Sequence, residues 1–164
     1  MTALETITAK AQEKGLRFLV IGGHAVMAHG FARSTYDLDL LVRANEREQW
    51  LQLLKEAGAT VHSSGKSFIQ FQPTTVFPET ADLMLVNDQT FEQFWIDSIV
   101  PVPPDSYGET RFVSLNHLIA LKCHAIKHGH AGRVEKDVDD ILELVKINKV
   151  DIADEKFRQL ILKH

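Results

Sequence analysis

Residues 20–42 read VIGGHAVMAHGFARSTYDLDLLV, and this stretch decides how the rest of the chain is interpreted. A short β-rich run ends at a pair of glycines, Gly22 and Gly23, and a brief apolar helix is predicted to follow them. The alternating residues at the end of the stretch predict a second strand, in which Asp37 and Asp39 project from one face and leucines from the other. We therefore expect a strand, a glycine turn, a helix and an acidic strand, in that order.

Asp37 and Asp39 would stand about 7 Å apart on one face of an otherwise apolar strand. Like charges this close repel each other and lose hydration unless a cation lies between them. Mg²⁺ suits such a pair, because it binds through one or two carboxylates and completes its shell with phosphate oxygens and water. The pair therefore predicts a divalent-metal site, with two ions if the chemistry is phosphoryl transfer. A loop or a solvated strand edge is the alternative for an Asp-x-Asp sequence on its own.

Gly22 and Gly23 lie where the first strand ends and the helix begins. Unpaired backbone amides at the start of a helix attract phosphate, and the absence of Cβ atoms lets the phosphate approach closely. The turn is therefore predicted to hold a phosphate group. An ordinary turn is the alternative for a Gly-Gly pair taken alone.

Together, these motifs resemble the signature of the DNA polymerase beta-like nucleotidyltransferase superfamily. Within it, the order of motifs is most similar to that of the bacterial abortive-infection toxin nucleotidyltransferases of type IV toxin–antitoxin pairs. The resemblance rests on Gly22, Gly23, His29, Gly30, Arg33, Thr35, Asp37 and Asp39. It implies an α+β (mixed α/β) nucleotidyltransferase fold with a mixed sheet flanked by helices. It also implies Mg²⁺, a nucleoside triphosphate (NTP) substrate, and transfer of a nucleoside monophosphate with loss of pyrophosphate.

The family also has a third carboxylate, on a later strand. Asp82 is the best candidate because it lies in the apolar β-like run TADLMLV, and Glu79 is the second choice. The resemblance gives this group the role of the base that takes the proton of the attacking hydroxyl, while the strand pair holds the metal ions. The predicted catalytic and metal-binding residues are therefore Asp37, Asp39 and Asp82.

Several side chains near these motifs are candidates for nucleotide binding. Arg33, Ser34 and Thr35 directly precede the acidic strand, where an arginine and hydroxyl groups are able to bind triphosphate oxygens. In the alternative interpretation, Arg33 pairs with Asp37 or Asp39 and only balances their charge. Both interpretations place Arg33 close to the acidic strand.

Two lysines in the C-terminal part of the chain are further candidates. Lys122 lies on the apolar stripe of a predicted helix, so it needs a partner. It either forms a buried ion pair with Asp137 of the next helix or reaches the nucleotide phosphates, as the family resemblance implies. Lys136 is the other candidate for phosphate binding, because Lys136 and Asp137 match the Lys-Asp pattern of the family.

A cationic cluster covers the same two predicted helices. Its members are Lys122, Lys127, Arg133 and Lys136, with His124, His128 and His130. The cluster could hold tRNA or another polyanion, but adjacent acidic residues cancel most of its charge and no aromatic residues are interleaved. A solvated helix hairpin is the favoured interpretation. The His124 and His128 pair lacks a third metal ligand, so the role of the histidines stays open.

The remaining elements follow from periodicity and from turn residues. With 164 residues, 45% of them hydrophobic and 24% charged, the chain predicts a single domain, residues 1–164. We expect an α/β body (1–113) and a helical cap (114–164). Helices are predicted at 2–14, 24–29 and 90–97, and a further helix is predicted from a cap at Asn45 to Gly58. In the C-terminal part, one helix is predicted to begin after a cap at Ser114, a second after a hinge at 129–132, and a third at Asp151. Strands are predicted at 17–21, 37–42, 60–62, 67–71, 81–86 and 110–113, and an extended proline segment at 99–103.

Bulk properties limit the location and the partners. The net charge of −4 gives no overall positive field for nucleic acid. The single cysteine, Cys123, is consistent with a reducing compartment. The N-terminal residues are unlike a secretory signal, and the longest apolar stretch is far shorter than the roughly 20 residues that span a membrane. We therefore expect a cytoplasmic protein with no membrane partner.

The leading functional hypothesis is a Mg²⁺-dependent enzyme that transfers a nucleoside monophosphate from an NTP to a protein or tRNA hydroxyl. The alternative is a catalytically inactive nucleotide-binding protein that works with a partner protein in a toxin–antitoxin-like module. Aminoglycoside-type transfer ranks last, because only Glu79 and Asp88 suggest an acidic acceptor pocket. The orientation of the Asp82 carboxylate toward Asp37 and Asp39 distinguishes the first two hypotheses.

Overall fold

A mixed β-sheet forms the centre of the protein. A computed structural model of the chain describes residues 2–101, 108–129 and 131–163. The sheet has five strands in the order β1-β2-β5-β4-β3, and they are β1 (Leu19–Val20), β2 (Asp37–Arg43), β3 (Thr60–Ser64), β4 (Phe68–Gln72) and β5 (Thr80–Val86). The central strands β2 and β5 are parallel, and every other pair is antiparallel.

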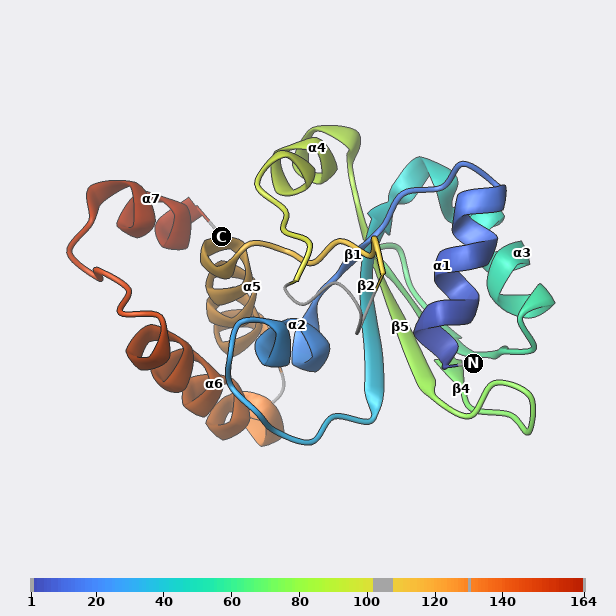
Figure 1. The fold of residues 1–164 in the computed structure, drawn as a ribbon, viewed down its shortest axis with the longest axis horizontal. Helices are drawn as coiled ribbons and strands as arrows, with labels where there is room; N and C mark the ends of the chain where they lie inside the picture. The colour runs from blue at the N-terminus through green and yellow to red at the C-terminus, as the bar shows by residue number, and fades with distance from the viewer. Residues whose placement is uncertain (1, 102–107, 130, 164) are drawn as a thin grey trace.

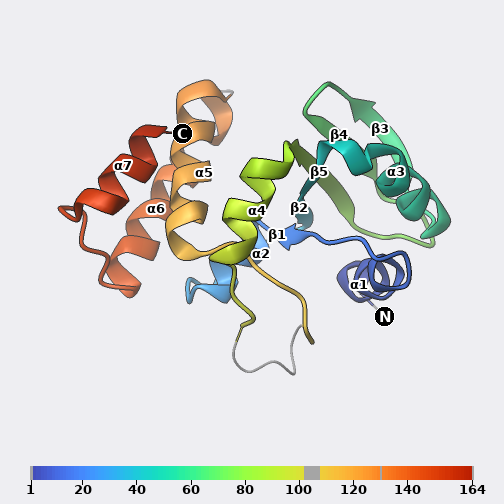
Figure 2. The ribbon, with the colours of Figure 1, turned by 90° about the horizontal axis from the view of Figure 1, so that it is seen from above.

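Helices cover both sides of this sheet. They are α1 (Ala3–Glu13), α2 (Gly22–Ala28), α3 (Arg47–Glu56), α4 (Asp88–Ile96), α5 (Leu115–His128), α6 (Val134–Ile147) and α7 (Glu155–Lys163), with 3₁₀ turns η1 (Ala44–Glu46) and η3 (Ala131–Arg133). Figures 1 and 2 show α1 and α3 on one side of the sheet, and α2, α5, α6 and α7 on the other. The expected fold class, a mixed sheet flanked by helices, is confirmed.

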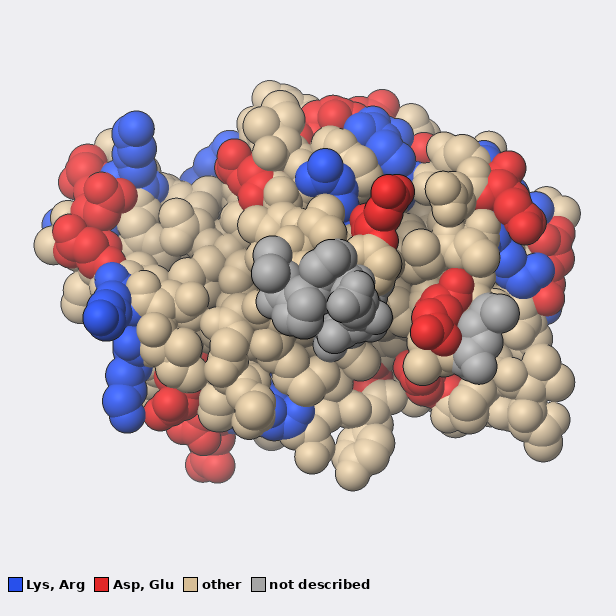
Figure 3. Space-filling view, viewed as in Figure 1, with Lys and Arg blue, Asp and Glu red and all other residues tan. Residues whose placement is uncertain are grey.

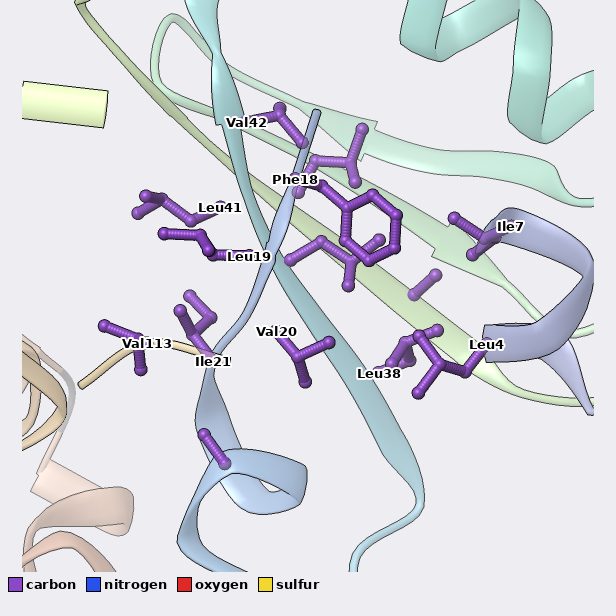
Figure 4. Close-up of a cluster of buried hydrophobic side chains, with 14 of the residues drawn as sticks. Leu4, Ile7, Phe18, Leu19, Val20, Ile21, Leu38, Leu41, Val42 and Val113 are labelled. Atoms are coloured by element: carbon purple, nitrogen blue, oxygen red, sulfur yellow. The ribbon is translucent and has the colours of Figure 1, made fainter. Parts of the chain in front are cut away.

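The core lies between the sheet and the first helices. Leu38 and Leu40, which alternate with the two aspartates of β2, are fully buried. Figure 4 shows Leu4 and Ile7 of α1 beside Leu38 and Phe18. Burying side chains of this size stabilises the fold by about 1.5–3 kcal/mol each, so this packing determines which face of β2 turns inward. The opposite face, with both aspartates, is therefore available for a site.

Local signals in the sequence account for most of the helix ends. The predicted first helix is confirmed, and Thr2 and Glu5 form a capping box at its start. Ser114 caps α5 as predicted, because its hydroxyl accepts a hydrogen bond from the His117 amide. The antiparallel strands β3, β4 and β5 form the predicted meander.

The cap predicted at Asn45 is wrong. Asn45 lies inside η1, and α3 begins at Arg47 after Glu46, which makes no side-chain capping bond. The Asn45 amide instead donates to Asp88 Oδ2 at 3.1 Å. A tertiary partner 43 residues away thus replaces the local capping role.

The strand predicted at 110–113 is reduced to single bridges. Phe112 pairs with Val20 in the parallel sense and with Ile99 in the antiparallel sense, outside the named strands. This segment therefore packs at the edge of β1 without extending the sheet. Of the extended segment predicted at 99–103, the last two residues lie outside the described part of the chain.

The last helix begins at Glu155, four residues after its predicted start. The Asp151 carboxylate accepts from the Ala153 amide at 2.9 Å and holds a turn. Asp154 then accepts from the Phe157 amide at 2.8 Å, in the manner of an N-cap. Among the described residues, no helix is long and apolar enough to cross a membrane.

Candidate active site

Three carboxylates gather on the sheet face opposite the main core. Asp37 and Asp39 project from β2, and Asp82 projects from the neighbouring parallel strand β5. Asp39 and Asp82 are direct register partners, so their side chains leave the sheet on the same side. The predicted third carboxylate is thus beside the acidic pair, although its catalytic role stays a prediction.

Burial and mutual repulsion perturb the acidity of two of these groups. Burial raises the pKa of Asp39 to about 6, and the negative charges of Asp82 and Asp37 add to the shift. Burial also raises the pKa of Asp82, and Asp37 acts in the same direction. Arg133 opposes both shifts through its positive charge. Carboxylates that are costly to ionise are the groups that a divalent cation stabilises most.

A hydrogen-bonded chain from the neighbouring strands holds Asp82. The Ser63 hydroxyl donates to Gln70 Oε1 at 2.6 Å, and Gln70 Nε2 donates to Asp82 Oδ2 at 3.4 Å. The register of β3, β4 and β5 places these three residues in a row across the sheet. The other oxygen, Asp82 Oδ1, is buried and has no hydrogen-bond partner among the described residues. An unpartnered buried oxygen is costly, so it is suited to accept from a ligand.

Gly22 permits the closest approach in the site. Its φ of +61° is favourable only for glycine, and a Cβ atom built there would lie 1.9 Å from Asp39 Oδ2. Gly23 has a similar constraint, because its Cβ would lie 2.4 Å from Thr35 Oγ1. Gly22 and Gly23 form the first turn of α2, and the Asp39 carboxylate and the Thr35 hydroxyl fill the space that their Cβ atoms would occupy.

Replacing Gly22 with alanine is expected to disrupt the site beyond its effect on the backbone. Gly15 offers a matched control, since its φ is +66° and no atom lies within 4 Å of a built Cβ. Both alanine variants should lose about 1–2 kcal/mol of stability through the left-handed backbone. Only Gly22→Ala should also displace Asp39 and weaken Mn²⁺ binding, by about tenfold or more, in a titration followed by electron paramagnetic resonance. Equal Mn²⁺ affinities in the two variants would contradict this contact.

A buried ion network links the loop before β2 to the helical cap. Asp140 is 1% exposed, and its carboxylate lies 2.8 Å from Arg33 Nε and 2.6 Å from Lys122 Nζ. Lys122 Nζ also donates to Asp137 Oδ1 at 2.9 Å. Of the two alternatives for Lys122, the buried pair with Asp137 is thus present. Arg33 pairs with Asp140, and not with Asp37 or Asp39 as the charge-balancing alternative required.

Two adjoining clefts open onto the carboxylates. The first, which we call the glycine cleft, has a volume of about 250 Å³ and is lined by both glycines, Thr35, Asp37 and Asp39 from the body and by residues of α5 and α6. Four cationic side chains also line it, namely Arg33, Lys122, Arg133 and Lys136. Arg133 and Lys136 are exposed and have no acidic partner within 4 Å in the described part of the chain. These two are free to meet an anion.

The second cleft, which we call the Asp82 cleft, has a volume of about 440 Å³ and lies over β4 and β5. Asp82 lines only this cleft, Asp37 lines only the glycine cleft, and Asp39 and Arg133 line both. The carboxylates therefore stand at the junction of two differently lined spaces.

Comparison with known proteins identifies the fold. No protein-family model matches the chain, and no curated protein matches its sequence. The structure of ANT(2'')-Ia in complex with adenylyl-2''-tobramycin aligns with a TM-score of 0.70 and 17% identity over 98% of this chain and 93% of that chain. The lincosamide antibiotic adenylyltransferase LnuA, bound to lincomycin, aligns with a TM-score of 0.64 and 16% identity over 88% of this chain and 96% of that chain. The chain has the nucleotidyltransferase fold.

A larger enzyme contains the same fold. The Megavirus polyadenylate synthase aligns with a TM-score of 0.63 and 14% identity, over 93% of this chain and 32% of that chain. Identities this low show a shared fold and do not transfer an activity to this chain. The function has to be argued from the site.

Within the nucleotidyltransferase fold, the structure separates some of the predicted residues from the site. Ser34 is exposed and lines neither cleft. Glu79, the second choice for the third carboxylate, lines a separate cavity of about 470 Å³ with His24 and Thr8. His124 lines the Asp82 cleft and lies against His128, with 4.5 Å between their ring centroids, whereas His130 lies outside the described residues.

Three functional candidates escaped the sequence interpretation. Arg133 was grouped with a solvated hairpin, but it reaches both clefts. Gln70 holds Asp82, and Phe68 lines the Asp82 cleft two residues before it on β4. The alternation in residues 68–72 would have placed Phe68 and Gln70 on one face, but the face could not be assigned before the pairing of β4 with β5 was known.

A metal ion at this site would take some of its ligands from phosphate oxygens and water. Among the described residues, no three His, Cys, Asp or Glu side chains are grouped as a metal site. Mg²⁺ does not require such a group, since one or two carboxylates suffice when phosphate oxygens and water complete its shell. The raised pKa of Asp39, with Asp37 two residues away on the same face of β2, fits a cation of this kind. Asp37 and Asp39 are therefore the residues that would hold it, and metal binding by Asp82 stays a prediction.

Proposed function

We propose that the chain is a divalent-metal-dependent nucleotidyltransferase, which transfers a nucleoside monophosphate from an NTP to a hydroxyl group. The observation that carries the proposal is the grouping of Asp37, Asp39 and Asp82 where a cleft lined by four Lys and Arg side chains meets a cleft lined by Arg133 alone of these types. The fold supports it, since neighbours of the same fold include an adenylyltransferase and a polyadenylate synthase.

The glycine cleft fits the triphosphate. Arg133 and Lys136 supply free positive charge, and the start of α2 at Gly22 and Gly23 lines the same cleft, where backbone amides are able to bind phosphate oxygens. Arg33 and Lys122 are held by Asp140, so they add positive charge at fixed positions. Divalent ions would neutralise the phosphates and polarise the α-phosphorus when bound to the carboxylates.

The acceptor reacts from the side of Asp82. Its hydroxyl oxygen attacks the α-phosphorus and forms a new P–O bond, while the bond between the α-phosphorus and the bridging oxygen breaks. Pyrophosphate leaves with that electron pair, and the hydroxyl proton passes to the Asp82 carboxylate. Because burial raises the pKa of Asp82, its ionised form is a better base than an exposed aspartate. The products are a nucleoside monophosphate ester of the acceptor, pyrophosphate and a proton.

The test is label transfer from each α-³²P-labelled NTP in the presence of Mg²⁺ and a cell extract. We expect transfer that stops when EDTA removes the metal and that falls about 100-fold or more in Asp82→Asn, the typical loss for a general base. Asp139→Asn is the matched control, because Asp139 is an exposed carboxylate of α6 outside both clefts. Full activity in EDTA, or in Asp82→Asn, would refute the proposal.

A second candidate function is a catalytically inactive nucleotide-binding protein that acts with a partner. One observation favours it, namely that no three metal-binding side chains are grouped among the described residues. In that case, NTP should bind with Mg²⁺ while no label is transferred to any acceptor. The expectation of a protein or tRNA acceptor, and of a toxin–antitoxin partner, stays a prediction that the same assay tests.

A further inference from the structure

The two clefts share Ile21, Asp39, Met84, Leu121 and Arg133, and they differ in the charged side chains that complete their linings. Cationic residues line the glycine cleft from both the body and the cap. In the Asp82 cleft, the lining charges are those of Asp39, Asp82 and Arg133 at the shared junction, with His124 as a further titratable group. The rest of its lining is apolar or carries uncharged polar groups such as Ser67, Gln70 and Thr90.

Large apolar side chains stand open in the Asp82 cleft. Phe68 is 43% exposed and Met84 is 37% exposed, and they are register partners on β4 and β5. Leu121 of α5 and Phe94 of α4 face the same space. A monomer gains nothing from exposing paired Phe and Met side chains beside a row of carboxylates, whereas a ligand with an apolar body would cover them.

The chemistry of transfer assigns this space to the acceptor. The base must lie within hydrogen-bond reach of the acceptor hydroxyl, and Asp82 lines only the Asp82 cleft. Its buried Oδ1 has no partner in the described part of the chain, while Gln70 fixes Oδ2. We therefore place the acceptor hydroxyl in the Asp82 cleft, as the donor that Oδ1 lacks, with the triphosphate on the other side of Asp39.

We propose that the acceptor is a small, uncharged molecule with an apolar body and a hydroxyl group, bound in the Asp82 cleft over Phe68 and Met84. This inference rests on the proposed function and narrows its acceptor. A volume of about 440 Å³ is that of a pocket for one small organic molecule.

The lining disfavours the other acceptor classes. An RNA acceptor needs several basic contacts, and Arg133 is the one Lys or Arg in the described lining of this cleft. On the face shown in Figure 3, basic and acidic side chains are interspersed. A polycation needs acidic partners, but Glu79 lines a different cavity and Asp88 lies beside Arg43 and Asn45. The acidic acceptor pocket considered from the sequence is therefore not formed by these two residues.

The experiment separates acceptors by their chemistry. Wild-type protein is incubated with α-³²P-labelled NTPs, Mg²⁺ and a cell extract that has been divided into four fractions. The fractions are RNA, protein, small molecules retained by cation exchange, and small uncharged molecules retained by a reversed-phase resin. We expect label in the last fraction, at least tenfold above the other three. Label that enters mainly RNA, protein or the cationic fraction would overturn this inference and leave the proposed function standing.

Calorimetry on the same protein measures NTP binding in the presence of Mg²⁺. This measurement distinguishes a failure of the acceptor inference from a failure of the proposed function. Binding without transfer to any fraction overturns the acceptor inference and favours the inactive nucleotide-binding alternative. Neither binding nor transfer overturns the proposed function as well. Each result therefore tests the acceptor inference, the proposed function, or both.

A cleft variant tests the location. Phe68→Ala removes an exposed ring from the floor of the Asp82 cleft and leaves all three carboxylates in place. We expect the KM for the acceptor fraction to rise about tenfold, in line with the loss of an apolar contact. The KM for NTP should change less than twofold. Leu162→Ala, which removes an 80% exposed leucine of α7, should change neither value. An unchanged acceptor KM, or equal rises for both substrates, would overturn the assignment of this cleft.

Discussion

Asp39→Asn is expected to abolish nucleotide transfer and, at the same time, to stabilise the metal-free protein at neutral pH. Asp39 lines both clefts and lies against Gly22, so it stands where the two parts of the proposed site meet. A metal ion supplies several kcal/mol of charge stabilisation, and each 1.4 kcal/mol corresponds to a factor of ten in rate. We therefore expect activity to fall by about 10³-fold or more.

The stability gain follows from the raised pKa of the same group. Burial, with repulsion from Asp82 and Asp37, raises the pKa of Asp39 to about 6 in the folded protein. The native state then holds this proton more tightly than the unfolded chain, whose aspartates titrate near 3.9. The stabilising contribution of the proton is present at low pH and is lost as the pH rises toward about 6. Above that pH, the ionised carboxylate costs the metal-free fold about 1–3 kcal/mol, which asparagine does not.

Thermal unfolding in EDTA between pH 4 and pH 8 measures this effect. The midpoint of Asp39→Asn should exceed that of the wild type by an amount that grows up to about pH 6 and is constant above it. Added Mn²⁺ should stabilise the wild type more than the variant, because it binds the folded state through this carboxylate. Asp139→Asn should match the wild type throughout. A variant that is less stable than the wild type at pH 7 without metal would show that the ionised Asp39 carboxylate does not destabilise the fold.

The sequence was sufficient to predict the elements that carry the site, because their signals are local. Asp37 and Asp39 alternate with buried leucines, and Gly22 begins α2 directly after a short apolar strand, so each could be assigned from its neighbours. Asp82 could be proposed from its apolar surroundings together with the family resemblance. Its position opposite Asp39 depends on a parallel pairing between strands about 40 residues apart, which no local pattern specifies.

Interactions over long separations could not be predicted in the same way. Arg33 was expected near Asp37 or Asp39, but its partner is Asp140, 107 residues further along the chain. Arg133 looked like part of a solvated hairpin, since nothing in its local sequence shows that the cap folds back over β2 and β5. The same limit explains Asn45, whose side chain binds Asp88 and does not cap α3. Side chains with distant partners override local preferences, and they are the ones that join the cap to the body.

Asp140→Ala is expected to cause the largest loss of stability. Asp140 is 1% exposed and holds two cations, Arg33 and Lys122, whose own side chains are 14% and 8% exposed. Removing its carboxylate would leave those cations without their main partner, although Lys122 would keep its bond to Asp137. Breaking a buried ion pair by deleting one member costs about 3–5 kcal/mol, because the other charge stays buried and unpaired.

Urea denaturation of Asp140→Ala and Asp139→Ala measures this cost with a matched control. The two aspartates are neighbours on α6, but Asp139 is exposed, so its replacement should change the free energy of unfolding by no more than about 0.5 kcal/mol. If Asp140→Ala does not fold, Asp140→Asn retains the shape and one acceptor oxygen and should show a smaller loss of the same sign. A difference between Asp140→Ala and Asp139→Ala of less than about 1 kcal/mol would mean that the network does not hold the cap to the body. The expected difference would instead show that Arg33 and Lys122 are fixed beside the glycine cleft before any nucleotide binds.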